Sequence, residues 1–204
     1  MLTKKQLNIL SVFKKKIFTS LTFKQIKQQS GQKSNNIVQI ALKEFQRQNL
    51  VKTKKIGDVI TYVLNIENNL MLSYLNLINE SEINKSKIPK ETLLNIQNRI
   101  FKYTEFFILI IFGSYAKNKA NKNSDLDVAV IVESDATKKN ITPYLETIKR
   151  RELTRIDYHI FTRLEFLEMI NADLENVGKQ IFKDNIIYYG YISYCNLINE
   201  KKNE

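Results

Sequence analysis

Two aspartates separated by a single residue are the side chains best placed to do chemistry. Asp125 and Asp127 lie at the start of an apolar, β-branched run, Val128–Val132, which is typical of a buried strand. Successive side chains of a strand alternate between its faces, so both carboxylates are expected on the same face. Two carboxylates so close together repel each other unless a cation lies between them. The pattern therefore predicts a divalent cation that prefers oxygen ligands, such as Mg²⁺; the alternative is a strand cap or a solvated turn.

A Gly-Ser pair, Gly113-Ser114, directly follows a second apolar run, Phe106–Phe112. A continuous apolar run indicates a strand buried on both faces, and the pair then begins a helix. Backbone amides at a helix start, together with a hydroxyl group, suit a bound anion. Combined with the paired aspartates, the Gly-Ser pair predicts a site for a metal ion and a triphosphate.

The combined pattern resembles the nucleotidyltransferase superfamily typified by DNA polymerase β. Minimal members of that superfamily have a Gly-Ser pair, a gap of ten residues and an Asp-x-Asp motif within apolar strands. This chain has Gly113-Ser114, the ten residues Tyr115–Ser124, and Asp125-Leu126-Asp127. The resemblance covers roughly residues 90–190. It implies an α+β fold in which helices flank a mixed sheet.

The resemblance also implies a third carboxylate on a neighbouring strand. Asp157 interrupts the β-prone run Arg155–Phe161 and supplies it, although an acid at an exposed strand end is the alternative. In the superfamily the first two acids hold two Mg²⁺ ions, for which Mn²⁺ can substitute, and the third helps to bind one ion and orients or deprotonates the attacking hydroxyl. By position these metal-binding and catalytic residues are Asp125, Asp127 and Asp157. A nucleoside monophosphate, most simply AMP from ATP, would then join the acceptor as pyrophosphate leaves.

The nucleotide phosphates are expected on the loop that begins with the Gly-Ser pair. The residues expected to bind them are Gly113, Ser114, Lys117 and Lys119. Relatives usually have an arginine after the Gly-Ser pair and a glycine a few residues later, where this chain has Tyr115 and Asn118. This departure concerns the loop side chains and leaves the three carboxylates unaffected.

Composition narrows the class of protein. The chain has 204 residues, of which 43% are hydrophobic, and this suits a globular protein with a buried core. A single cysteine and a single histidine exclude an intramolecular disulfide framework and a zinc finger. The longest apolar run is far shorter than a membrane span, and no signal peptide is evident. We therefore expect a soluble cytoplasmic protein that does not bind a membrane.

Positive charge is concentrated in the first third of the chain. The net charge is +11, and residues 1–70 hold 13 lysine and arginine residues against three acidic residues, a net charge of +10. The remaining residues, 71–204, carry a net charge of only +1. An asymmetry on this scale predicts two modules, of which the first has a polyanionic partner. The alternative is a solvated basic face in a lysine-rich protein.

The first module resembles the winged helix-turn-helix family over about residues 3–66. Its pattern predicts three helices, the third from about residue 35 to 48 with Ile37, Ile40, Ala41 and Phe45 buried, and then a hairpin around Gly57-Asp58. The family implies that the third helix enters the DNA major groove and that the hairpin contacts the backbone. The expected DNA-binding residues are Asn35, Asn36, Gln39, Lys43, Arg47, Lys52, Lys54 and Lys55. A structural or protein-docking module is the alternative.

The expected domains are a winged helix-turn-helix at residues 1–66, a connector helix and linker at 67–87, and a nucleotidyltransferase domain at 88–204. The connector either packs within the chain or pairs two copies into a homodimer, which would suit the reading of paired DNA half-sites.

Three hypotheses for function follow. The first is an antitoxin-like enzyme that transfers AMP to a partner protein, such as a toxin, and binds DNA through its first module. The short second domain favours a protein acceptor, because relatives that modify aminoglycosides or tail tRNA have a large second lobe. The second is a transcriptional regulator whose nucleotidyltransferase fold senses a nucleotide or docks a partner without catalysis. The third has nucleic acid as the acceptor.

Overall fold

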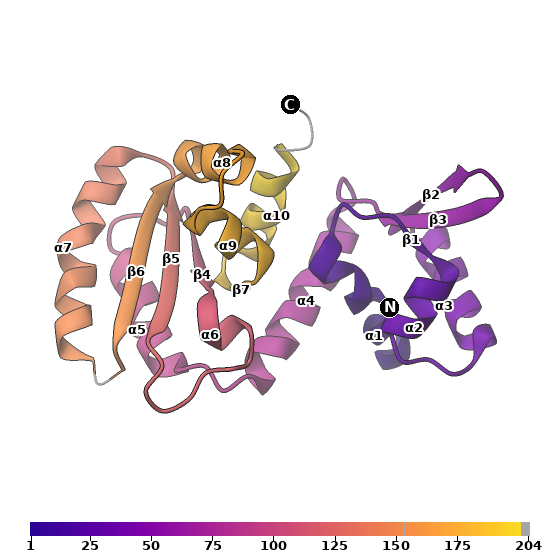
Figure 1. The fold of residues 1–204 in the computed structure, drawn as a ribbon, viewed down its shortest axis with the longest axis horizontal. Coiled ribbons are helices and arrows are strands. Elements are labelled where there is room, and N and C mark those ends of the chain that lie inside the picture. Colours follow the sequence, from indigo (N-terminus) through magenta and orange to yellow (C-terminus); the bar gives the residue numbers. More distant parts are fainter. Residues whose placement is uncertain (153, 201–204) are drawn as a thin grey trace. The chain divides into compact units, whose positions relative to one another are not determined.

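The computed structural model describes residues 1–152 and 154–200 and divides the chain into two compact units, Met1–Ile78 and Asn79–Glu204. The division falls inside helix α4 (Asn69–Lys85), within the segment expected to connect the modules (Figure 1). Residues 71–78 carry no charged side chain, so the net charge is +10 in the first unit and +1 in the second. Among the described residues, no helix is both long and apolar enough to cross a membrane.

The first unit begins with a helical layer. Its elements are α1 (Lys4–Leu10), the 3-10 helix η1 (Ser11–Lys16), α2 (Phe23–Gln29) and α3 (Asn35–Arg47). Helix α2 begins with a reciprocal cap, in which the Thr22 hydroxyl accepts a hydrogen bond from the Gln25 amide and the Gln25 side chain accepts one from the Thr22 amide. The helices enclose a core of fully buried side chains: Ile9, Leu10, Phe13, Ile26 and Phe45.

The buried face of α3 differs from the face expected from its sequence. The expectation that Ile40 is buried is wrong, because this side chain is 54% exposed, and Ile37 is only partly buried. Val38 and Leu42 are buried instead, beside Ala41 and Phe45. These four positions follow the i, i+3, i+4, i+7 spacing of a single helix face, so the helix is rotated from the expected orientation and exposes Ile40.

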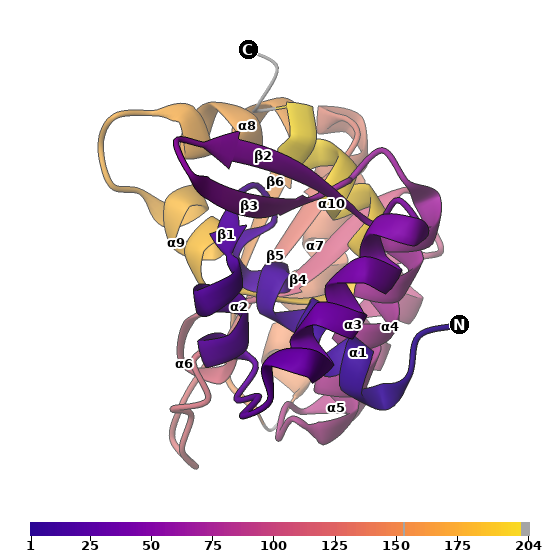
Figure 2. The same cartoon turned by 90° about the vertical axis from the view of Figure 1, so that its right-hand side faces the viewer.

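A small antiparallel sheet completes the first unit. Strands β2 (Val51–Ile56) and β3 (Val59–Leu64) form the expected hairpin, and the two-residue strand β1 (Leu21–Thr22) pairs with β3 (Figure 2). The turn consists of Gly57 and Asp58, and Gly57 has a φ of +58°, a left-handed conformation that glycine adopts without steric cost.

The second unit contains a four-stranded mixed sheet in the order β6-β5-β4-β7. Its strands are β4 (Phe107–Ile111), β5 (Leu126–Val132), β6 (Ile156–Thr162) and β7 (Ile186–Tyr189). β5 and β6 are parallel, whereas β4 pairs antiparallel with both β5 and β7. All five side chains of β4 are buried, as expected for the apolar run that precedes Gly113.

Helices cover both faces of this sheet, as expected for an α+β domain. On one face, α5 (Lys90–Ile100) and α7 (Asp135–Arg151) pack against alternate side chains of β5 such as Val128 and Val130. Helices α8 (Arg163–Asn171), α9 (Val177–Lys183) and α10 (Tyr191–Glu200) form a second group, in which α8 contacts β5 and β6 and α10 contacts β4 (Figure 1). The single-turn helix α6 (Gly113–Ala116) follows β4 and contacts β5.

Candidate active site

The turn between β4 and α6 packs directly against the Asp127 carboxylate. Gly113 has a φ of +63°, and a Cβ atom at this position would lie 1.9 Å from Asp127 Oδ2, far inside the contact distance. The Ser114 amide donates a hydrogen bond to the same carboxylate. Gly113 therefore serves two purposes: it permits the left-handed turn and leaves room for the aspartate. The Gly-Ser pair and the Asp-x-Asp motif predicted from the sequence meet here.

Asp127 and Asp157 lie side by side on the parallel strands β5 and β6. They are register partners, and paired residues on adjacent strands are typically about 4.8 Å apart between Cα atoms. Both side chains lie on the sheet face opposite Leu126, Val128 and Ile156, which belong to the core beneath α5 and α7. The third carboxylate predicted from the sequence thus stands next to Asp127.

Burial raises the pKa of Asp127 above its ordinary value, and the neighbouring carboxylates of Asp157 and Asp125 raise it further. The Ser114 amide and His159 act in the opposite direction and favour the carboxylate. Asp127 is therefore an anion held among other anions in a partly dehydrated position, where a bound cation would lower its energy.

Asp125 lies just before the first residue of β5 and is exposed. A local turn places it: the Ser124 amide donates to the Asn121 carbonyl, and the Asn121 amide donates to the Ser124 hydroxyl at 2.9 Å. The Asn123 amide also donates to the Asn121 side chain. These short-range hydrogen bonds order the end of the loop from which Asp125 projects.

Two basic side chains approach Asp157, which is 54% exposed on the edge strand β6. Lys149 Nζ, from the last turn of α7, lies 3.9 Å from Asp157 Oδ1, and His159 Nε2 lies 3.7 Å from Oδ2. The His159 ring stacks parallel to that of Phe161, with centroids 6.0 Å apart. His159 lies two residues after Asp157 and therefore on the same face of β6. Nothing in the sequence indicates the contact of Lys149, because it depends on how α7 packs beside β6.

The three aspartates do not form a ready ligand cluster. Within residues 1–152 and 154–200, no group of three or more His, Cys, Asp or Glu side chains is arranged to hold a metal ion. The physical reason is that the oxygens of Asp157 face Lys149 and His159, while Asp125 projects into solvent. The carboxylate oxygens nevertheless suit a divalent cation, because Asp127 is partly buried and is repelled by the carboxylates of Asp157 and Asp125.

The four residues expected to bind phosphate lie on α6 and the turn after it. Gly113 and Ser114 begin α6, and the Ser114 amide is already bonded to Asp127. Lys117 Nζ lies 3.8 Å from Asp184 Oδ2, a contact that the sequence did not indicate because Asp184 follows α9 far along the chain. Lys119 is exposed, and its amide closes the α6 turn on the Ser114 carbonyl at 2.9 Å.

The eight residues expected to bind DNA are all exposed on the first unit. Asn35, Asn36, Gln39, Lys43 and Arg47 lie on α3, and Lys52, Lys54 and Lys55 lie on β2. Two of these cations have acidic partners: Arg47 donates to Glu44 at 2.6 and 2.8 Å, and Lys52 lies 2.6 Å from Glu67. The hydrogen bond from Arg47 lowers the pKa of Glu44 to about 2.

Comparison with known proteins relates most of the second unit to one family. Residues 94–191 match the family model described as Polymerase beta, Nucleotidyltransferase. The matched segment contains the whole four-stranded sheet, the Gly113 turn and all three aspartates. The match supports a polymerase β-like nucleotidyltransferase domain in this unit. No match was found among curated proteins or among solved structures.

The Gly113 contact with Asp127 predicts the effect of adding a single methyl group. We expect Gly113→Ala to lower the free energy of unfolding by more than Gly31→Ala does. Both glycines have a positive φ, near +65°, and therefore incur a similar backbone cost of about 1–2 kcal/mol. Only Gly113 also places the new Cβ against a carboxylate, since nothing lies within 4 Å of the Cβ position at Gly31. Urea unfolding of both variants measures the difference, and equal losses would contradict this close approach.

The raised pKa of Asp127 predicts how stability depends on pH. The stability that Asp127 contributes is fully present at pH values below the unfolded-state pKa, about 3.9, and is lost as the pH rises through its higher folded-state pKa. Asp127→Asn should therefore raise the Tm at pH 7 in EDTA, and the gain should vanish near pH 3. Differential scanning calorimetry at both pH values tests this, with Asp125→Asn as an exposed control that should change the Tm little.

Proposed function

We propose that the chain is a Mg²⁺-dependent nucleotidyltransferase that moves a nucleoside monophosphate, AMP from ATP, onto an acceptor hydroxyl. The observation that carries the proposal is the pairing of Asp127 with Asp157 beside the Gly113 turn, inside the segment that matches the nucleotidyltransferase family. The metal ion that binds the nucleotide phosphates and the attacking hydroxyl both require carboxylates in close proximity.

Each aspartate has a distinct role in the proposed reaction. Asp125 and Asp127 would hold the ion, which would supply positive charge to the α-phosphate and to the leaving pyrophosphate. Asp157 accepts the proton of the acceptor hydroxyl, whose oxygen forms a bond to the α-phosphorus while the bond to pyrophosphate breaks. Lys149 and His159 position the Asp157 carboxylate from two sides. Ser114 orients Asp127 through its amide, and Lys117 and Lys119 attract the phosphates.

We propose a partner protein as the acceptor. Asp157 is more than half exposed and lies on an edge strand, so a hydroxyl on a folded protein can approach it from the side of the sheet. A tyrosine of a small toxin-like protein is the acceptor suggested by the sequence resemblance. This would make the chain antitoxin-like, with nucleic acid as the competing acceptor.

We also propose that the first unit binds DNA as a winged helix-turn-helix. Its net charge of +10, its exposed α3 face with Asn36, Gln39 and Lys43, and its lysine-rich hairpin support this role. The second candidate function is a regulator that senses a nucleotide without catalysis and binds DNA through the same first unit. Such a regulator would not require Asp157 beside Asp127.

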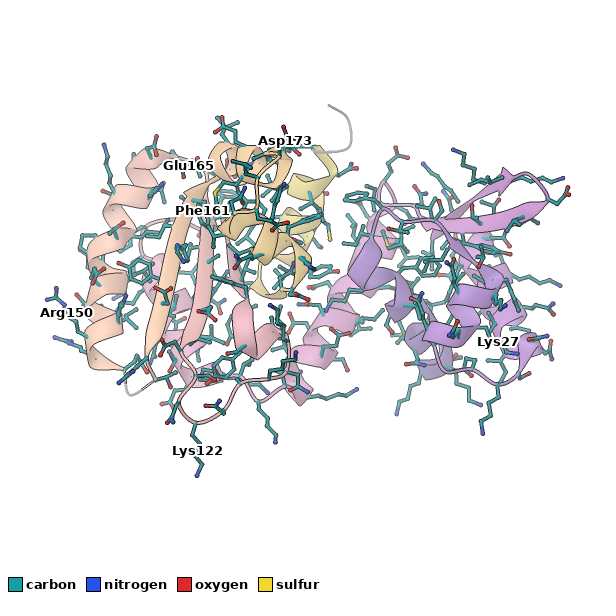
Figure 3. All side chains as sticks on the ribbon, viewed as in Figure 1. Lys27, Lys122, Arg150, Phe161, Glu165 and Asp173 are labelled. Atoms are coloured by element: carbon teal, nitrogen blue, oxygen red, sulfur yellow. The ribbon has the colours of Figure 1, made fainter. Side chains whose placement is uncertain are left out.

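Transfer is tested with the full chain, Mg²⁺, cell lysate and each of the four α-labelled nucleoside triphosphates. Asp127→Asn and Asp125→Asn should each reduce incorporation of label at least about 100-fold, because each removes a charge that the transferred group and its ion require. The control is Asp173→Asn, which removes an exposed carboxylate from the loop between α8 and α9 (Figure 3). Protease and nuclease treatment of the labelled product identifies the class of acceptor.

Full incorporation by Asp127→Asn would overturn the proposed mechanism. Metal-dependent nucleotide binding by the parent chain without release of pyrophosphate would favour the regulator that only senses nucleotide.

DNA binding is tested by its dependence on salt. The probe is duplex DNA of random sequence, whose affinity reflects phosphate contacts. The double variant Lys43→Gln/Lys54→Gln should bind more weakly, and the slope of log K against log salt should become shallower by about 2, one unit for each lost contact. The control is Lys4→Gln/Lys5→Gln, which removes the same charge from α1. Equal effects in both variants would show that only total charge matters and would contradict the proposed interface.

A further inference from the structure

A groove of about 500 Å³ lies between α5 and α7 in the second unit. Two helical stripes, each with the i, i+3, i+4, i+7 spacing of a single helix face, form its walls. One stripe runs from α5 into the turn after it, and the other lies on α7, with Glu152 at its end. The lining residues are Asn95, Asn98, Arg99 and Lys102 on one side and Tyr144, Thr147, Ile148, Arg151 and Glu152 on the other. The volume falls within the range of small-molecule sites.

The groove has an excess of positive charge. Arg99, Lys102 and Arg151 line it, and within residues 1–152 and 154–200 none of the three forms an ion pair with an acidic side chain. Arginine and lysine side chains that converge on a concave surface are suited to phosphate. This local excess contrasts with the net charge of only +1 for the whole unit.

The acidic residue in the groove, Glu152, is already engaged by neutral donors. Its carboxylate accepts hydrogen bonds from Thr92 Oγ1 at 2.8 Å and from Asn95 Nδ2 at 3.1 Å. These bonds tie the end of α7 to α5 and hold the two walls together. Glu152 therefore has a structural role at one end of the groove and is not paired with the cations beside it.

Aromatic rings lie at the other end of the groove. Tyr144 lines this end, and the ring of Tyr103 lies beside it with the two centroids 4.6 Å apart; both side chains are exposed. A hydrogen bond with Tyr144 raises the pKa of Tyr103, while the nearby Arg99 guanidinium lowers it, so this end combines an aromatic surface with a cation. Exposed rings beside cations are a common arrangement for stacking a nucleobase next to its phosphate.

The groove is separate from the aspartate site. Ile148 belongs to the same core as Val128 and Ile156, so the groove lies on that side of the sheet. Asp127 and Asp157, which alternate with those residues along their strands, lie on the opposite side. The two features therefore cannot be parts of a single pocket.

We propose that the groove between α5 and α7 is a second site for a nucleotide phosphate. Arg99, Lys102 and Arg151 bind the phosphate, and the Tyr103–Tyr144 pair stacks the base. The ligand is either a free nucleotide or the terminal nucleotide of a single strand, which have this chemistry in common. Binding needs no metal ion, because the three cations of the groove neutralise the phosphate directly. The one acidic residue that lines the groove, Glu152, is already hydrogen-bonded to Thr92 and Asn95.

Binding is measured with the full chain in EDTA, using fluorescent ADP and a labelled single-stranded oligonucleotide as probes. The groove variant is Arg99→Gln/Lys102→Gln/Arg151→Gln. The matched control, Lys85→Gln/Lys139→Gln/Arg150→Gln, removes the same charge at exposed positions of the same unit that do not line the groove; Arg150 projects from α7 away from the sheet (Figure 3). Circular dichroism and the Tm of both variants verify folding. Tyr144→Ala and Tyr144→Phe separate the contribution of the ring from that of the hydroxyl.

The groove variant should raise the Kd at least about tenfold, since exposed charged contacts contribute modestly but sum over three side chains, whereas the control should leave it nearly unchanged. Tyr144→Ala should weaken binding and Tyr144→Phe should retain it. If the groove variant loses affinity for both probes, the ligand is a free nucleotide. If it loses affinity for the oligonucleotide alone, the ligand is the end of a single strand. No binding of either probe by the parent chain, or equal losses in the groove variant and the control, would overturn the proposal. These outcomes are independent of the transfer assay, because EDTA removes the metal that transfer requires.

Discussion

Repulsion between neighbouring carboxylates is the constraint around which the second unit is organised. The parallel pairing of β5 with β6 sets Asp127 beside Asp157, and burial makes the charge of Asp127 more costly. The Ser114 amide from α6 and His159 from β6 offset this cost at Asp127, while Lys149 from α7 lies 3.9 Å from Asp157. The placement of α6 and α7 is therefore coupled to the charges at the beginning of β5 and β6. A cation bound at this site would reduce the repulsion between its carboxylates and lower their electrostatic energy.

Helix α7 combines three roles, and Ile148 has two of them because it both packs into the core and lines the groove. Ile141, Leu145 and Ile148 pack into the core, Lys149 turns around the edge of the sheet to Asp157, and Tyr144 and Arg151 line the groove shared with α5. Because one rigid helix carries all three, a displacement of α7 would alter the core, the position of Asp157 and the groove together.

The features that the sequence predicted are those determined by short-range rules. The hairpin at Gly57-Asp58 and the buried run before Gly113 depend on neighbouring residues, and the structure contains both. The face of α3 was misassigned because several apolar residues fit overlapping helical spacings, and only packing selects Val38 and Leu42 over Ile40. The contact of Lys149 with Asp157 and the groove between α5 and α7 require the tertiary arrangement of helices beside the sheet. No local pattern encodes such an arrangement.

In the proposed reaction, the position of Asp157 on an edge strand has a consequence for substrate choice. A catalytic carboxylate at the bottom of a cavity excludes reactants by size, because the walls must admit them. The Asp157 side chain is 54% exposed, so it does not lie in a closed cavity that would limit the bulk of the molecule presenting a hydroxyl. Discrimination between acceptors must then come from the surfaces that surround the edge. Under the proposed mechanism, changes to those surfaces would alter the acceptor while leaving the chemistry unchanged.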